Sequence, residues 1–252
     1  MSQRFAGKNC IVTGAGSGVG RATAIRLANE GAKVWCVDIH SDAVEETAAK
    51  VRLNGGVAKA TALDVSDEKA VFALVDTLIA DWQHLDVLCN IAGIGGMKRF
   101  DEMTPEFFQR MLAVNLTGPF LLCRASIKHL LEAKGNIVNM ASTAGVIGQA
   151  YVSAYATAKH GLVGLTRSIA MEYAKKGLRC NAICPGAINT PLINTFAAFP
   201  EGIDTSLINR YNFLPFFSEP EEIAGMVAYV ASAEARYVNG AVLAIDGGIT
   251  AG

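Results

Sequence analysis

The sequence lacks long apolar runs and blocks of like charge. No stretch approaches the roughly 20 apolar residues of a membrane span, and the opening MSQRFAGKNCIVTG lacks the basic segment and apolar run of a signal peptide. Low-complexity segments and internal repeats are also missing, and the formal net charge is −1. We therefore expect neither nucleic acid nor a membrane as a partner.

Cysteine and histidine are too scattered to suggest a metal site. The four histidines lie far apart in the sequence, and Cys180 and Cys184 fit no zinc-binding spacing. Five of the six cysteines lie in strand-like apolar runs, where a free thiol packs as a small hydrophobic group. We therefore predict structural thiols, no metal and a reduced, cytoplasmic protein.

What the sequence does have is an alternation of short apolar runs with longer helical patterns. Strand-like runs cover 9–14, 33–39, 57–65, 85–93, 136–142, 178–186 and 241–247. Helical patterns cover roughly 18–30, 41–53, 67–82, 105–133, 152–175 and 220–232. Several strand runs are apolar at consecutive positions, which is typical of parallel strands covered on both faces. The pattern predicts one doubly wound (Rossmann) α/β domain over residues 1–252, with about seven parallel strands between two helix layers.

Periodicity lapses between residues 187 and 219. This segment is too long for an ordinary connection, and such segments are often lids or binding loops. It carries apolar residues suited to an apolar or aromatic ring, namely Leu192, Ile193, Phe196, Phe199, Phe213, Leu214, Phe216 and Phe217. We predict a substrate lid here, although most of these residues are expected to serve as packing anchors.

A glycine-rich turn follows the first predicted strand. The run Thr13-Gly14-Ala15-Gly16-Ser17-Gly18-Val19-Gly20 leads at once into a helix. Glycines allow a tight turn and a close approach to a pyrophosphate, which the helix start then binds. Asp38 ends the next strand twenty residues after Gly18, a distance suited to a carboxylate that bonds both ribose hydroxyls. Together these features predict a dinucleotide site.

Tyr155 and Lys159 lie four residues apart on a predicted helix, with Ser142 thirteen residues before the tyrosine. Positions i and i+4 share one helix face. A lysine ammonium beside a phenol favours the phenolate, so we expect the pKa of Tyr155 to lie below that of free tyrosine. Such a phenol can exchange a proton near neutral pH.

These motifs resemble those of the short-chain dehydrogenase/reductase family over essentially the whole chain. The matching segments are TGAGSGVG (13–20), Asp38, DV (64–65), NIAG (90–93), Asn115, Ser142, Tyr155-x-x-x-Lys159 and PGAINTP (185–191). Ile91 departs from the family's usual Asn-Asn-Ala-Gly, and LPFFSEPEEIA departs from its frequent Gly-Arg before Pro-Glu-Glu.

The resemblance implies a role for each matched residue. Tyr155 would be the acid/base, Lys159 would keep its phenol poised and bond the nicotinamide ribose, and Ser142 would bond the substrate oxygen. Asn115 would order a water that leads from the lysine to solvent. The other cofactor contacts implied are Gly14, Ser17, Gly18, Val19 and Gly20 at the turn, Asp64 and Val65 beside the adenine, Asn90, Ala92 and Gly93 near the ribose, and Pro185, Gly186, Ile188 and Thr190 at the nicotinamide amide.

The resemblance also implies a homo-oligomer, a tetramer or a dimer, built on the helices at 105–133 and 152–175. Because Asp38 would repel a 2′-phosphate and neither Ser17 nor Ile39 offers a cation, we predict NAD as cofactor and oxidation of an apolar, cyclic or aromatic secondary alcohol or diol. An NADPH-dependent carbonyl or ketoacyl reductase, a non-catalytic dinucleotide sensor and a structural oligomer with a vestigial site are the alternatives.

Overall fold

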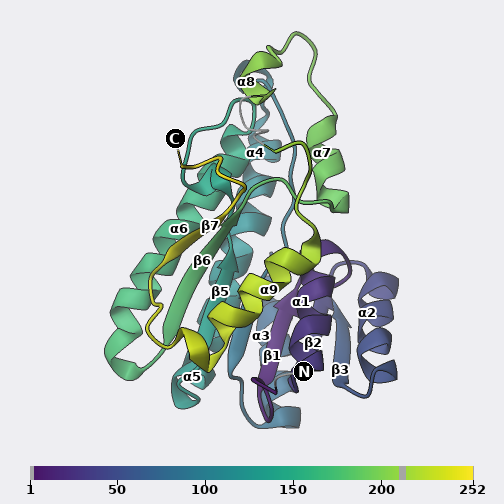
Figure 1. Cartoon of the computed structure of the whole chain (residues 1–252), viewed down its shortest axis with the longest axis vertical. Helices are drawn as coiled ribbons and strands as arrows, with labels where there is room; N and C mark the ends of the chain where they lie inside the picture. Colours follow the sequence, from purple (N-terminus) through teal and green to yellow (C-terminus); the bar gives the residue numbers. More distant parts are fainter. Residues whose placement is uncertain (1–2, 210–213, 252) are drawn as a thin grey trace.

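The protein is built on one sheet of seven parallel strands in the order β3-β2-β1-β4-β5-β6-β7 (Figure 1). The computed structural model describes residues 3–209 and 214–251. The strands are β1 Asn9–Thr13, β2 Lys33–Asp38, β3 Val57–Ala62, β4 Val87–Asn90, β5 Asn136–Met140, β6 Arg179–Pro185 and β7 Val242–Ile245. Each lies within a predicted run, so the predicted doubly wound α/β fold is confirmed.

Helices cover both faces of the sheet. The helices α1 (Gly18–Asn29), α2 (Ser41–Leu53) and α9 (Pro220–Ala231) pack on one face, and α3 (Glu68–Trp82), α5 (Gly118–Glu132) and α6 (Ser153–Tyr173) pack on the other (Figure 1). Successive residues of β1 alternate between the two cores: Cys10 and Val12 belong to the first and Ile11 to the second. This explains the consecutive apolar residues of the strand runs. In the described part of the chain, no helix combines the length and hydropathy needed to span a bilayer.

The predicted helix at 105–133 is three pieces rather than one. α4 (Pro105–Leu112) and α5 are joined by a π-helical turn over Ala113–Thr117. Pro119 has no N–H to donate to the carbonyl of Asn115, as a continuous α-helix would require. The π-turn around Asn115 ends directly before α5, of which Pro119 is the second residue. Such π-turns are frequent at functional sites.

The segment 187–219 forms a long loop whose two ends lie side by side. Ile188 and Ser218 form an isolated parallel bridge, and the side chain of Asn189 donates to the Glu219 carboxylate at 3.1 Å. The described residues between these ends include the short helices η5 (Pro191–Ile193), α7 (Asn194–Ala197) and α8 (Ser206–Asn209). Phe213, which we assigned to the lid from sequence, lies outside the described residues.

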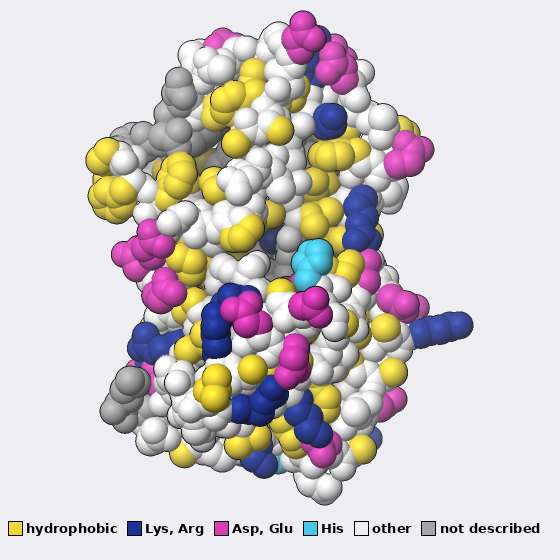
Figure 2. Space-filling model, turned by 90° about the vertical axis from the view of Figure 1, so that its right-hand side faces the viewer, with side chains coloured by type: hydrophobic (Ala, Val, Ile, Leu, Met, Phe, Trp, Pro, Cys, Tyr) yellow, Lys and Arg dark blue, Asp and Glu magenta, His cyan; other side chains and the backbone are white. Residues whose placement is uncertain are grey.

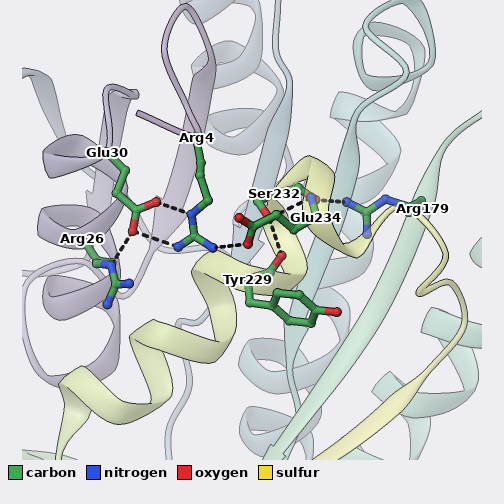
Figure 3. A network of polar contacts seen from close by, with 7 residues as sticks. All are labelled: Arg4, Arg26, Glu30, Arg179, Tyr229, Ser232 and Glu234. Carbon is green, nitrogen blue, oxygen red and sulfur yellow. Dashed lines mark hydrogen bonds and ion pairs between the residues drawn. The ribbon is translucent and has the colours of Figure 1, made fainter. Parts of the chain in front are cut away.

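At the N-terminal edge of the sheet, charged side chains bind one another (Figure 3). Glu30, whose side chain is 4% exposed, accepts hydrogen bonds from Arg4 and from Arg26, both at 2.5 Å. Arg4 also reaches Glu234 at 2.8 Å, so it links α1 to the turn η6 (Ala233–Ala235) that follows α9. Hydrogen bonds from Arg4 are the main reason that the pKa of Glu30 lies below its usual value.

Arg179 completes this edge at the start of β6. Its guanidinium donates to the carbonyls of Val230, Val238 and Ser232 at 3.0–3.2 Å, close to the end of α9 (Figure 3). Carbonyls at a helix C-terminus have no partner within the helix, and a cation there is stabilising. Arg179 therefore fastens α9 to the sheet.

Candidate active site

A cavity of about 560 Å³ opens at the C-terminal edge of the sheet. Figure 2 shows the molecule hollowed at mid-height, with hydrophobic side chains gathered above the hollow and charged ones of both signs below. Almost every residue assigned to a site from the sequence lines this cavity, namely Gly14, Ser17, Gly18, Val19, Gly20, Asp38, Asp64, Val65, Ala92, Gly93, Asn115, Ser142, Tyr155, Lys159, Pro185, Gly186, Ile188 and Thr190. The exception is Asn90.

The glycine turn forms an open backbone cradle at the start of α1. Gly14 has φ +68°, and a Cβ on Gly20 would lie 2.0 Å from the Gly14 carbonyl oxygen, so neither position accepts a side chain. Ser17 caps α1 without a side-chain hydrogen bond, and the first turn holds no acidic residue. The first N–H groups of α1 therefore remain available to an anion, and this cradle fits the pyrophosphate of a dinucleotide.

Asp38 is positioned by two backbone N–H groups at the end of β2. Its Oδ2 accepts from Gly16 at 2.9 Å and its Oδ1 from His40 at 3.0 Å. Each carboxylate oxygen keeps a second lone pair, which can accept from a ribose hydroxyl. The carboxylate is thus fixed beside the glycine cradle, with acceptor positions left for hydroxyl donors.

Asp64 is held at the end of the cavity expected to receive the adenine. Its Oδ1 accepts from the Ser66 hydroxyl at 2.6 Å, and its Oδ2 accepts from Arg110 at 3.1 Å. Burial raises the pKa of Asp64, but the hydrogen bonds from Ser66 and Arg110 together lower it below its usual value. Two apolar residues that sequence reasoning missed, Ile39 and Leu63, line the cavity beside it.

Asn90 lies behind the surface of the cavity rather than on it. It is 2% exposed, and its side chain donates to Asn139 Oδ1 at 2.8 Å between β4 and β5. The cavity surface there is formed by the two following residues, whose backbone N–H groups both donate to the Thr13 hydroxyl, Ile91 at 2.9 Å and Ala92 at 3.0 Å. Thr13 lies within the glycine motif, but its spacing does not reveal this bracing contact.

Tyr155 and Lys159 are both buried on α6. The Lys159 Nζ lies 5.5 Å from the centre of the Tyr155 ring and donates to the Met140 carbonyl at 2.8 Å. Burial raises the pKa of Tyr155 to about 12, against a lowering contribution from Ser142. Burial lowers the pKa of Lys159 to about 8.

The expectation that Tyr155 has a lowered pKa is therefore wrong for the polypeptide by itself. The i, i+4 spacing does place the lysine beside the phenol, but it says nothing of how deeply the pair is buried. Loss of water disfavours the phenolate and the ammonium alike, and here burial has the largest influence on the pKa of each group. Both groups are thus held closer to their neutral forms than in water.

Ser142 and Asn115 approach the pair from two other elements. Ser142 ends the strand run of β5, and its Oγ accepts from the N–H of Ala144 at 3.1 Å. Asn115, in the π-turn, accepts from Ile94 N at 3.2 Å and donates to Ile94 O at 3.0 Å. A Cβ on Gly93 would lie 2.8 Å from Asn115 Oδ1 and 3.6 Å from Lys159 Nζ, so these three residues converge.

The part of the cavity above Tyr155 is apolar. Phe196 of α7 packs edge-on against the Tyr155 ring with centroids 5.3 Å apart, and Met97, Val152 and Ile208 join the same cluster. Leu192 and Ile193 line the cavity as well. Of the predicted lid residues, Phe199, Leu214, Phe216 and Phe217 are instead exposed.

Tyr151 connects the 187–219 segment to the loop before α6. Its φ of +64° is unusual for a residue with a side chain. Its carbonyl accepts from Lys98 N at 2.8 Å, and its hydroxyl accepts from Asp204 N at 2.9 Å. One residue therefore holds both the 94–99 loop and the 187–219 segment in place.

Comparison with known proteins agrees with this geometry. Residues 14–250 match a family model described as "Enoyl-(Acyl carrier protein) reductase". Levodione reductase of Leifsonia aquatica is 41% identical over 98% of this chain and 96% of its own. This chain belongs to the short-chain dehydrogenase/reductase family. As a family member it is an oxidoreductase that uses a nicotinamide dinucleotide, NAD or NADP.

Other short-chain dehydrogenases match over the full chain. Cis-4-hydroxycyclohexanecarboxylate dehydrogenase of Sinomonas cyclohexanicum is 39% identical over 100% of both chains. The crystal structure of levodione reductase superposes with a TM-score of 0.91 over 98% of this chain and 99% of that one. A short-chain dehydrogenase from Mycobacterium paratuberculosis bound to NAD superposes with a TM-score of 0.93 at 31% identity, over 99% and 100% of the two chains.

Proposed function

We propose that the protein oxidises a cyclic secondary alcohol with NAD. The observation that carries this proposal is the apolar wall of Phe196, Met97, Val152 and Ile208 around the Tyr155 ring. Such a wall suits a hydrocarbon ring better than a phosphorylated or thioester substrate. Two relatives, levodione reductase and cis-4-hydroxycyclohexanecarboxylate dehydrogenase, are named for cyclic compounds, which supports the same substrate class.

In this mechanism Tyr155 removes the hydroxyl proton and Ser142 steadies the substrate oxygen. A nicotinamide ring held in the cavity would supply the acceptor for the hydride. Ser142 is suited to its role because it sits at a strand end on the cavity wall, where a donor can stabilise charge that develops on oxygen. Lys159 lies against the phenol ring and would supply the positive charge that favours its anion.

Asn115 is proposed to order a water molecule through which protons pass from Lys159 to solvent. Both ends of its side chain are bonded to Ile94, which fixes the loop that includes Gly93. Since Gly93 approaches both Asn115 and Lys159, this loop borders the lysine ammonium. A water relay to solvent remains the proposed function of this arrangement.

The preference for NAD is proposed from Asp38. Its carboxylate lines the cavity and is fixed by Gly16 and His40, so a 2′-phosphate at the ribose would meet a negative charge. The nearest cation of the turn, Arg21, is bound to the Gly16 carbonyl at 2.6 Å and to Glu46 at 2.9 Å. Because cellular NAD is mostly oxidised, NAD use favours alcohol oxidation over ketone reduction.

We also propose a homo-oligomer. Phe120 on α5 and Met171 on α6 are large apolar side chains that are 44% and 81% exposed. These two helices lie on the same face of the sheet, and a second copy that covered them would remove this apolar surface from water.

A panel of secondary alcohols with each dinucleotide tests the proposal, with reduced-nicotinamide absorbance as readout. Cyclohexanol should be oxidised, with kcat/KM for NAD exceeding that for NADP by about tens- to hundreds-fold. Asp38→Ala should lower this ratio, because it weakens the binding of NAD and removes the repulsion of the 2′-phosphate of NADP. Asp42→Ala, one turn further on and not lining the cavity, is the matched control. Equal efficiency with NADP in the unmodified protein would support the NADPH-dependent reductase, and binding without turnover would support a sensor.

A further inference from the structure

Gln149 is a polar residue that lines the same cavity as the apolar residues around Tyr155. It is half-buried and lies on the loop between η3 (Thr143–Gly145) and α6. Its side-chain Nε2 donates to the Thr143 hydroxyl at 3.0 Å. Across residues 3–209 and 214–251, its Oε1 and its second N–H find no hydrogen-bond partner.

Two other polar side chains of the cavity are already used by the protein. Thr195 donates its hydroxyl to the Leu192 carbonyl at 2.7 Å, and Asn115 is bonded at both ends of its amide. Buried or half-buried amides in proteins are normally satisfied. Gln149 thus differs from its neighbours in presenting one donor and one acceptor to the cavity.

The anchor of this amide is next to the reaction centre. Thr143 is 4% exposed and directly follows Ser142, the residue proposed to bond the reacting oxygen. The Gln149 amide is therefore fixed on the same wall as Ser142, and a ring whose reacting carbon faces Ser142 and Tyr155 would present its remaining carbons to the apolar residues and to Gln149.

On the basis of the proposed function, we propose that the substrate is a ring that carries a second oxygen substituent, and that Gln149 binds this oxygen and determines specificity. A carboxamide pairs equally well with a hydroxyl or a keto oxygen. A ring without the second oxygen would leave the amide desolvated and unpaired, which disfavours its binding.

The test compares cyclohexanol with the cyclohexane-1,2-, 1,3- and 1,4-diols in the full-length protein and in Gln149→Met, which keeps the side-chain length but cannot bond oxygen. After correction for two equivalent hydroxyls, at least one diol should exceed cyclohexanol in kcat/KM by about tenfold in the unmodified protein. In Gln149→Met this ratio should fall about tenfold, chiefly through a higher KM for the diol.

A matched pair at the anchor separates binding from loop structure. Thr143→Val removes the acceptor that orients Gln149 and should lower the diol-to-cyclohexanol ratio, whereas Thr143→Ser keeps the hydroxyl and should retain it. Equal losses for cyclohexanol and the diols in Gln149→Met, or a ratio near one in the unmodified protein, would overturn the inference and leave the proposed function standing. Failure to oxidise any of these rings with either dinucleotide would overturn both.

Discussion

The two edges of the sheet use buried polar groups in opposite ways. At the N-terminal edge, Glu30 is bound by two arginines, and Arg179 donates to three carbonyls. At the C-terminal edge, Tyr155 and Lys159 are also buried, yet no carboxylate in the described residues forms an ion pair with the lysine, which donates instead to the Met140 carbonyl. At the N-terminal edge the charged groups bind one another and hold segments together. At the C-terminal edge they have no such partner in the described part of the chain and are available for proton transfer.

The pKa values of the buried groups are shifted in different ways at the two edges. Hydrogen bonds lower the pKa of Glu30 and keep it ionised, so its charge is stabilising. Burial moves the pKa of Tyr155 to about 12 and that of Lys159 to about 8, so their charged forms are destabilised. Groups perturbed in this second way, in a cavity, are characteristic of functional sites. Substitutions at the two edges should accordingly affect different quantities.

The largest effect is expected from Tyr155→Phe, which removes the hydroxyl and keeps the ring against Phe196. Turnover should fall by about two to four orders of magnitude, the usual contribution of a general acid/base. Steady-state kinetics measure the loss, while dinucleotide binding followed by calorimetry should persist. Near-normal turnover would exclude the proposed role of Tyr155.

Glu30→Ala should show the opposite profile. It leaves Arg4 and Arg26 without their shared carboxylate, and removal of one member of a buried ion pair is strongly destabilising. We expect a loss of about 2–4 kcal/mol in the free energy of unfolding, measured by urea titration, with kcat preserved in the folded fraction. Arg26→Ala is the control: its side chain is 44% exposed, so its loss should cost less than about 1 kcal/mol. If both variants lost a similarly small amount of free energy of unfolding, the cluster would contribute no more to stability than an exposed ion pair.

Lys159→Met should make the protein inactive and more stable. The folded pKa of about 8 lies below the reference value of 10.5, so the unfolded chain binds more protons between these pH values and stability rises with pH across them. Below pH 8 the buried ammonium is destabilising, and its removal should add about 1–3 kcal/mol to the free energy of unfolding.

This gain should disappear as pH rises from about 8 to 10.5, because the unmodified lysine then loses its proton in both states. Melting temperatures at pH 7 and pH 10 measure it. Tyr155→Phe, which keeps the lysine, should show no such pH dependence in this window. A gain that is the same at both pH values would mean that Lys159 is not held with a lowered pKa.

The sequence could predict the features that depend on local pattern. Strand ends, the glycine cradle and the Tyr155–Lys159 pair all follow from short-range spacing, which fixes which residues share a helix face or a strand end. The π-turn was missed because helical periodicity alone does not register the effect of Pro119 on the bond that Asn115 would otherwise accept.

What could not be predicted depends on packing between distant segments. Phe196 reaches Tyr155 while Phe199, three residues later, is 53% exposed, and nothing in the local pattern separates them. Burial, which reverses the expected pKa of Tyr155, is likewise a property of the whole fold. Gln149 belongs to no motif, because its significance comes from the apolar surroundings that other segments supply.

The pairing of α1 with α9 has a consequence for how the chain is made. Of the strands in the sheet, β1 is synthesised first and lies between β2 and β4, and the core that α1 shares with α9 includes Leu27 of α1 and Val227 of α9. At about 5–20 residues per second, α9 leaves the ribosome roughly 10–40 s after α1. Until α9 has been made, the part of this face that it covers is exposed, so the face closes only after α9 is synthesised, and chaperones have access to it during this interval.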